Sequence, residues 1–213
     1  TAHSILLTKA AEKMGVDGAL VVTPYYNRPP QRGLLEHFKA VAAETSLPLM
    51  LYDIPSRSGL KIDHSVLVEL SGVENIVAVK DSAGDVQGAA RLIRQASEGF
   101  QVYCGNDGDT LPWLSVGAVG VVAVASHLVG PQMAEMISLF KSGDAEAARK
   151  IHLDLMPVFD AMGITTNPIP VKAALALLGQ PGGNPRPPLP AATPGEVGRI
   201  REILARAGIG GIR

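Results

Sequence analysis

Short apolar runs alternate with helical segments along the first part of the chain, and this alternation constrains the fold more than any other feature. Continuously apolar runs of this length predict strands that are covered on both faces. We expect strands at 18–23, 49–52, 76–80, 101–104 and 120–124. Helical periodicity predicts helices at 4–14, 34–43, 64–70, 86–96 and around Trp113. Strands that alternate with helices are typical of parallel βα units, so the predicted fold class is α/β.

The remainder of the chain, after Val124, predicts helices only. One helix is expected around 133–140, a second from Asp144 through Phe159, and a third at about 169–178. A linker rich in proline and glycine covers 179–190. The string Thr193-Pro-Gly-Glu196 then matches a capping box with proline at the first helical position, which predicts where the last helix begins.

Two architectures accommodate five βα units followed by helices. One is an open doubly wound sheet, and the other is part of an eight-stranded (β/α) barrel. The open sheet would be favoured by a glycine-rich phosphate loop, but the sequence contains neither GxGxxG nor GxxxxGK[ST]. The chemically interesting residues instead follow several different strands, which is where barrel enzymes place their active sites.

Charge and composition exclude several classes of function. The chain carries 19 basic and 20 acidic residues, for a net charge of −1, so neither nucleic-acid nor membrane partners are expected. Cys104 is the single cysteine, which precludes an intrachain disulfide and fits a reducing, cytoplasmic compartment. We expect it to be a buried, inert thiol. The five histidines lack metal-ligand spacing, so no metal site is predicted, and no GxSxG string supports a hydrolase triad.

Three residues at strand ends are candidates for chemistry. Lys80 ends an apolar run, where a low dielectric would disfavour its ammonium form and free the amine to attack a carbonyl. Taken alone, however, the residue is better explained as a lysine that reaches water or pairs with Asp81 or Asp85, because lysines are mostly exposed. Tyr52 ends another run and could transfer protons, and Arg57 in the following loop could bind a carboxylate. Packing and surface charge are the alternative roles for these two residues.

Two further loops also follow predicted strands. Tyr25 and Tyr26 lie in a proline-rich loop, and could form a proton relay or an aromatic contact across a subunit interface. Gly105 permits close approach of the backbone to a ligand, and Asn106 can hydrogen-bond to one. A tight turn explains the second loop equally well.

Five strings together resemble one family, the dihydrodipicolinate synthases of the dihydrodipicolinate synthase/N-acetylneuraminate lyase class I aldolase superfamily. They are VTPYYNRPPQ, LYDIPSRSG, AVKDSAGD, CGNDGDTLPWLSVGAVGVVAV and NPIPVK, in this order along essentially the whole chain. The resemblance implies a (β/α)8 TIM barrel, of which about the last five strands and the C-terminal helices are present. It divides the chain into a partial barrel at 1–130 and a final barrel helix with a helical extension at 131–213.

The resemblance also implies a reaction and a set of roles. The reaction is the condensation of pyruvate with L-aspartate 4-semialdehyde in lysine and diaminopimelate biosynthesis, by a homodimer or homotetramer without cofactors. Lys80 matches the Schiff-base lysine, Tyr52 the tyrosine that transfers protons, and Tyr26 the tyrosine that completes the relay in a neighbouring subunit. Arg57 matches the arginine that binds the semialdehyde carboxylate. Three further positions around the pyruvate-derived group are Gly105, Asn106 and Val122.

The sequence departs from the family at two places. The first three βα units and a GTTGE-type threonine loop have no counterpart, so we expect either a segment of a longer chain or a shortened relative. His3 stands where lysine-inhibited members have a carboxylate, so feedback inhibition by lysine is not expected. Two alternatives stay open: another pyruvate-dependent aldolase of the superfamily, which Arg57 argues against, and a truncated paralogue without catalytic activity.

Overall fold

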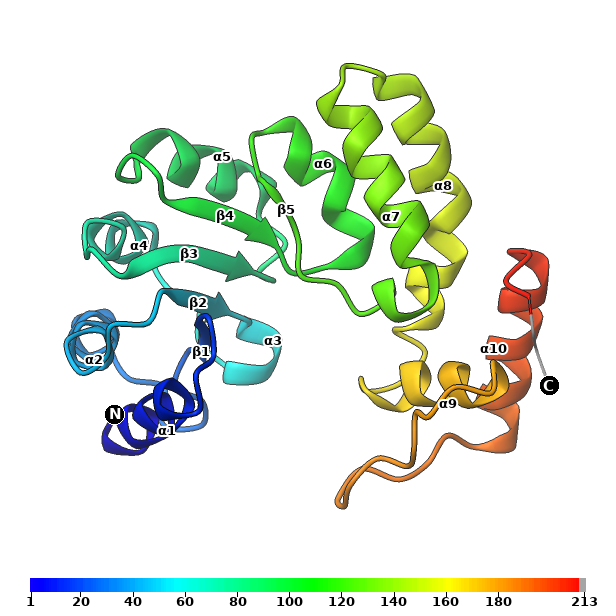
Figure 1. Cartoon of the computed structure of the whole chain (residues 1–213), viewed down its shortest axis with the longest axis horizontal. Helices are drawn as coiled ribbons and strands as arrows, with labels where there is room; N and C mark the ends of the chain where they lie inside the picture. The colour runs from blue at the N-terminus through cyan, green and yellow to red at the C-terminus, as the bar shows by residue number, and fades with distance from the viewer. Residues whose placement is uncertain (211–213) are drawn as a thin grey trace. The chain divides into compact units, whose positions relative to one another are not determined.

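The computed structural model describes residues 1–210 of the chain (Figure 1). The last three residues of the predicted helical extension lie outside this range. The chain divides into two compact units, Thr1–Val122 and Ala123–Arg213. The sequence places a boundary at residue 130, as the end of a partial barrel; this partition stays a prediction.

The first unit is built on a five-stranded, all-parallel sheet whose strands lie in sequence order (Figure 1). The α/β class with a parallel sheet is therefore confirmed. An open doubly wound sheet reverses its strand order at one point, and this sheet has no such reversal. The strands are β1 (Ala19–Val22), β2 (Leu49–Asp53), β3 (Ile76–Asp81), β4 (Gln101–Cys104) and β5 (Gly120–Val121).

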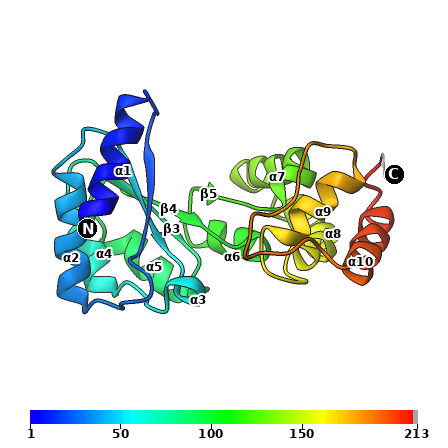
Figure 2. The ribbon, with the colours of Figure 1, turned by 90° about the horizontal axis from the view of Figure 1, so that it is seen from below.

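Helices connect these strands and supply one wall of the core. Alternate residues of the strands point to the same face, and on one face Leu51, Val79 and Val102 are buried in a cluster with Phe38 and Trp113. The helix α1 lies beside α2 and β1 (Figure 2). The helices of this unit are α1 (Ala2–Lys13), α2 (Gln31–Ala42), α3 (Pro55–Ser58), α4 (His64–Leu70), α5 (Val86–Gln95) and α6 (Thr110–Ser115), with a 3-10 turn at Asp107–Asp109.

The opposite face of the sheet is partly open in this chain. Leu20 and Val22 of β1 are exposed, and so is Val77 of β3. Val77 lies at an irregularity in the pairing, because Leu49 pairs with Ile76 whereas Met50 pairs with Ala78. The candidate residues Tyr52 and Lys80 are half-buried on this face.

Several helix bounds differ from the sequence prediction, most of all that of α7 (Ser126–Lys141), and two short elements differ in kind or length. The expected strand at 120–124 is shortened to Gly120–Val121, and Val122 makes one further ladder bond to Cys104 O at 2.9 Å before the chain leaves the sheet. The short helix α3 was not predicted, because four residues carry no helical periodicity. The sequence nevertheless contains residues typical of helix ends. Pro55 is the first helical residue, and Gly59 is the C-cap, with a positive φ of 73°.

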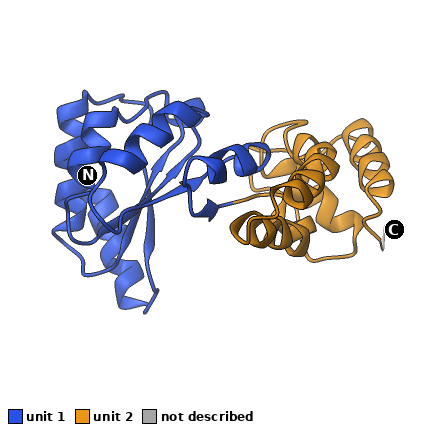
Figure 3. Ribbon diagram, turned by 90° about the horizontal axis from the view of Figure 1, so that it is seen from above, with its two compact units in different colours: residues 1–122 blue, residues 123–213 orange. Residues whose placement is uncertain are grey.

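The second unit consists of helices (Figure 3). The predicted start of the last helix is confirmed: Thr193 Oγ1 accepts from Glu196 N at 3.3 Å, and Glu196 Oε2 accepts from Thr193 N at 2.7 Å. Within residues 1–210 no strand follows β5. The helices are α7 (Ser126–Lys141), α8 (Ala145–Ala161), α9 (Ile169–Leu177) and α10 (Pro194–Arg206).

Candidate active site

The pairing register brings together two of the residues singled out from the sequence. Tyr52 pairs with Lys80, and Lys80 pairs with Tyr103, so one row crosses β2, β3 and β4 near their carboxyl ends. Register partners on neighbouring parallel strands point to the same face of the sheet. The Lys80 ammonium group lies 4.2 Å from the centroid of the Tyr52 ring. An amine is thus held against a phenol ring at the end of the sheet where barrel enzymes place their chemistry.

Tyr103 is the member of this row that sequence reasoning missed. It borders Lys80 on the side away from Tyr52, and its hydroxyl hydrogen-bonds with Gln101 Oε1 at 3.0 Å. Its position at a strand end, just before the Gly105–Asn106 turn, could have indicated it as a candidate. The row therefore contains two tyrosines, of which one contacts the amine with its ring face and the other is bonded within its own strand.

The residues that follow Tyr52 and Lys80 form a second pair on the other face. Asp53 pairs with Asp81 at the ends of β2 and β3, and their exposed fractions are 0% and 4%. Burial, and after it the Asp81 carboxylate, raise the pKa of Asp53 to about 7. Burial likewise raises the pKa of Asp81 above its ordinary value. At this end of the sheet, Lys80 therefore lies on one face and the two carboxyl groups lie on the other.

The Arg57 side chain lies in the connection between β2 and α4. It is exposed on the short helix α3, which begins two residues after the buried Asp53. The Ser58 hydroxyl lies 2.8 Å from Leu60 O and 3.0 Å from Ile54 O, inside the same connection. These bonds fold the connection into a compact loop that presents Arg57 beyond the end of β2.

The end of β4 explains the glycine at position 105. Gly105 N donates to Asp81 O at 2.8 Å, and a Cβ at this position would overlap the Ser82 hydroxyl. The Ser82 hydroxyl oxygen is itself buried without a hydrogen-bond partner. Asn106 donates from its side-chain amide to Asp109 Oδ2 at 2.9 Å, so that amide is held in place locally.

In the loop after β1, two residues have a strained backbone conformation and one of them is almost fully exposed. Tyr26 has a φ of 72° and is 94% exposed, and Arg28 has a φ of 46°. Side chains other than glycine rarely adopt positive φ, and such strain is frequently found at functional sites. The structure does not bring the Tyr26 ring to Lys80. Thr23, which the sequence did not single out, anchors the loop by donating from its hydroxyl to Tyr52 O at 2.9 Å.

Several other sequence predictions concern chemistry outside this row. Cys104 is buried, as predicted, and burial raises the pKa of its thiol to about 12, so it is not a nucleophile near neutral pH. Among residues 1–210, no group of three or more His, Cys, Asp or Glu side chains is arranged as a metal site. Over the same range, no helix combines the length and the apolar character that crossing a membrane requires.

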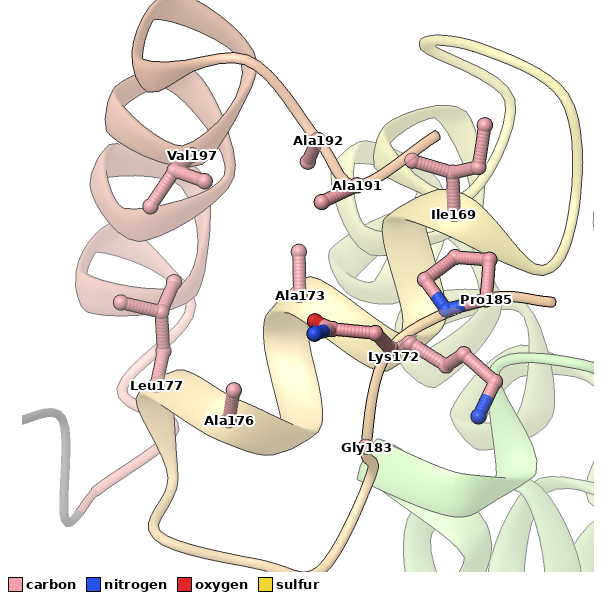
Figure 4. Close-up of a pocket in the computed structure, with 11 residues that line it drawn as sticks. Ile169, Lys172, Ala173, Ala176, Leu177, Gly183, Pro185, Ala191, Ala192 and Val197 are labelled. Carbon is pink, nitrogen blue, oxygen red and sulfur yellow. The ribbon is translucent and has the colours of Figure 1, made fainter. Parts of the chain in front are cut away.

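A cavity of about 280 Å³ lies in the second unit (Figure 4). It is walled by α9, α10 and the loop between them, mostly with apolar side chains, and Lys172 is its one charged residue. Lys172 Nζ donates to Gly182 O, so its amine is used within the unit. None of the predicted site residues lines this cavity, and the candidate chemistry belongs to the first unit.

Comparison with known proteins identifies close relatives. The dihydrodipicolinate synthetase family profile matches residues 1–207. The 4-hydroxy-tetrahydrodipicolinate synthase of Moorella thermoacetica is 46% identical over 209 residues, which cover 98% of this chain and 72% of the relative. The enzyme of the same name from Desulforudis audaxviator is 47% identical, over 97% of this chain and 70% of the relative.

Solved structures that resemble this chain belong to the same family. The lysine-bound dihydrodipicolinate synthase of Cyanidioschyzon merolae superposes with a TM-score of 0.94 at 44% identity, over 97% of this chain and 70% of that chain. The Thermotoga maritima dihydrodipicolinate synthase gives 0.93 at 36% identity, over 97% and 71%. The shared fold therefore extends over nearly all of this chain.

Proposed function

The chain belongs to the dihydrodipicolinate synthetase family, and we propose that it condenses pyruvate with L-aspartate 4-semialdehyde to 4-hydroxy-tetrahydrodipicolinate. This makes it a lyase of the class I aldolase type that serves lysine biosynthesis. We propose further that its sheet represents about the last five strands of a (β/α)8 barrel, because the strands are parallel, in sequence order and wound without reversal.

The observation that carries the proposal is the Lys80 amine held over the Tyr52 ring. In the proposed mechanism, Lys80 Nζ bonds to the carbonyl carbon of pyruvate, and the carbonyl oxygen takes up two protons and leaves as water. The resulting protonated Schiff base loses a methyl proton to give an enamine. That carbon bonds to the aldehyde carbon of the semialdehyde, whose oxygen takes up a proton. The substrate's own amine then displaces Lys80 as the ring closes.

Tyr52 is proposed to transfer the protons of these steps, since its phenol lies on the same face as the amine. Tyr26 is proposed to complete the relay in a neighbouring subunit of a homodimer or homotetramer. Its exposed fraction of 94% and its positive φ support this role, because an exposed ring is available to a partner. One related solved structure, 36% identical, is described as a monomeric variant.

The remaining proposed roles concern substrate binding. Arg57 would bind the semialdehyde carboxylate with its planar guanidinium group. The backbone and side chains around the pyruvate-derived group would come from Gly105, Asn106 and Val122. The chain is also proposed to act in the cytoplasm. No metal or organic cofactor is proposed, because the Lys80 amine supplies the electrophilic activation in this mechanism.

The test of the proposed function is an assay with exchanged aldehydes. Purified protein is given pyruvate together with L-aspartate 4-semialdehyde, or with aldehydes that lack its carboxylate, and consumption of pyruvate is followed. The proposal expects turnover with the semialdehyde and little with the others, because only the semialdehyde can pair with Arg57. Preference for another aldehyde would instead identify a different pyruvate-dependent aldolase of this superfamily.

A further inference from the structure

A buried carboxyl group closes the loop that carries Arg57. Asp53 is the last residue of β2, and both of its carboxyl oxygens lie 3.3 Å from the backbone nitrogen of Ile62. Both residues are 0% exposed. The bond therefore joins the two ends of the connection 54–61 inside the protein, where water cannot replace a lost partner.

The same connection is held from outside at neighbouring residues. Gln31, at the start of α2, donates from its side-chain amide to Lys61 O at 2.8 Å and accepts from Asp63 N at 2.9 Å. These contacts are exposed to solvent, so water can replace them at little cost. Of the two attachments, the buried bond from Asp53 to Ile62 is the one whose loss leaves a donor unsatisfied.

Between these attachments, the backbone that carries Arg57 is held at both ends. The loop turns through α3, is bridged by the Ser58 hydroxyl to Leu60 O, and returns to the buried Ile62. Because Asp53 also follows Tyr52 directly, one residue links the strand that presents the phenol to the loop that presents the guanidinium group. We propose that Asp53 is a positioning residue for Arg57, which sets the distance between the semialdehyde carboxylate and the reacting carbon.

This proposal rests on the proposed function, and the position of Asp53 on the far face of the sheet keeps it away from substrate. Tyr52 and Lys80 share the open face, whereas Asp53 shares the helix-covered face with Asp81. Burial beside Asp81 raises the pKa of Asp53 to about 7, so an uncharged side chain that accepts one hydrogen bond is compatible with the site. Asn is such a side chain, and Ala is not.

The test compares Asp53→Asn with Asp53→Ala in steady-state kinetics with both substrates. The alanine variant is expected to raise the KM for L-aspartate 4-semialdehyde by roughly tenfold, because a misplaced binding group weakens orientation of the reacting atoms. The asparagine variant keeps an acceptor for Ile62 N, and its KM is expected to stay close to the unmodified value. The KM for pyruvate should change in neither variant.

A double variant separates positioning from general loosening of the fold. In the Arg57→Ala background, Asp53→Ala is expected to produce no further rise in the semialdehyde KM, since the group that it positions is gone. If Asp53→Ala does not fold, Ser58→Ala removes the hydroxyl bridge of the same loop, and the same reasoning applies to it. An equal rise in both backgrounds would overturn the proposal.

Reductive trapping of pyruvate by borohydride distinguishes failure of this inference from failure of the proposed function. Unmodified protein and all variants except those of Lys80 are expected to form the pyruvyl adduct, because trapping does not involve Arg57. No adduct in any of them would remove the proposed function itself. Adducts in all, together with an unchanged semialdehyde KM in Asp53→Ala and Ser58→Ala, would show that Asp53 does not position Arg57.

Discussion

The two faces of the sheet at the ends of β2 and β3 have opposite chemistry, although they are built from consecutive residues. Tyr52 and Lys80 lie on the open face, where a small molecule can reach the amine. Asp53 and Asp81 lie on the helix-covered face and are almost fully buried. Because neighbouring residues of a strand point to opposite faces, the lysine is one residue from a carboxyl group and still separated from it by the sheet.

This separation resolves one ambiguity of the sequence. Lys80 could have been paired with Asp81 or Asp85, and such a pair would have held its proton. Asp85 instead pairs with Lys61 at 3.1 Å and with Arg91 at 3.8 Å. The open face thus keeps its amine beside an aromatic ring, whereas the carboxyl groups of the covered face accept hydrogen bonds from the loop backbone.

Loss of the amine should have the largest effect. Lys80→Arg keeps a positive charge over Tyr52 but cannot form a Schiff base, so kcat is expected to fall by about ten-thousandfold or more. Thermal unfolding should be nearly unchanged, because the Lys80 side chain is half-buried and makes its described contact with the Tyr52 ring, which Lys80→Arg can keep. Retention of more than a small fraction of the activity would place the nucleophile elsewhere.

The two tyrosines of the row provide a matched comparison. Tyr52→Phe keeps the ring under the ammonium group but removes the proton-transferring hydroxyl, and kcat is expected to fall by roughly a hundredfold to ten-thousandfold. Tyr103→Phe removes a hydroxyl that bonds to Gln101, and little change is expected. Equal losses in the two variants would contradict the role given to Tyr52.

Removing the guanidinium group should affect one substrate only. A hydrogen bond to a charged group contributes about 1.5–3 kcal/mol, so Arg57→Ala is expected to raise the semialdehyde KM by roughly tenfold to a hundredfold. The KM for pyruvate serves as the internal control and should not change. Arg57→Lys should recover part of the loss, because the charge returns without the planar, bidentate geometry.

Asp53, on the covered face, should make the free energy of unfolding depend on pH. The pKa of Asp53 is raised to about 7 in the fold by burial and by Asp81, and is lowered again in part by the Ile62 amide and by Lys61. The folded state therefore binds a proton that the unfolded chain releases near pH 4. The contribution of this proton to stability is complete at low pH and is lost as the pH rises through 7.

Asp53→Asn removes this titration and provides the measurement. Between pH 5 and pH 8, the free energy of unfolding of the unmodified protein should fall relative to the variant by roughly 2 kcal/mol. Urea unfolding of both proteins at several pH values measures this difference. A constant difference across this range would show that Asp53 does not take up the proton.

The sequence predicted the elements well because the strong local signals agree with the tertiary structure. The helix at 64–70 and the strand at 101–104 have the predicted bounds, and the capping box at Thr193 is present. Strand length was overestimated at 120–124, because pairing depends on a neighbouring strand rather than on local composition. Helix α3 was missed because four residues hold no periodic signal.

Part of the site could not be read from the sequence for a related reason. The proximity of Tyr52 to Lys80 follows from strand ends meeting at one edge, and the sequence indicated both residues. The exact pairing of Tyr52 with Lys80 depends on the irregularity near Val77, which no local pattern signals, and the pairing of β3 with β4 then adds Tyr103 to the same row. Sequence reasoning did not single out Asp53, and its burial identifies it as an anchor.

The most direct test of the account is reductive trapping of this chain with pyruvate and borohydride, read by intact mass and peptide mapping. The account predicts a single reduced pyruvyl adduct on Lys80, and no adduct in Lys80→Arg. An adduct on another lysine, an adduct that persists in Lys80→Arg, or no adduct on the folded protein would contradict the assignment of Lys80 as the Schiff-base amine.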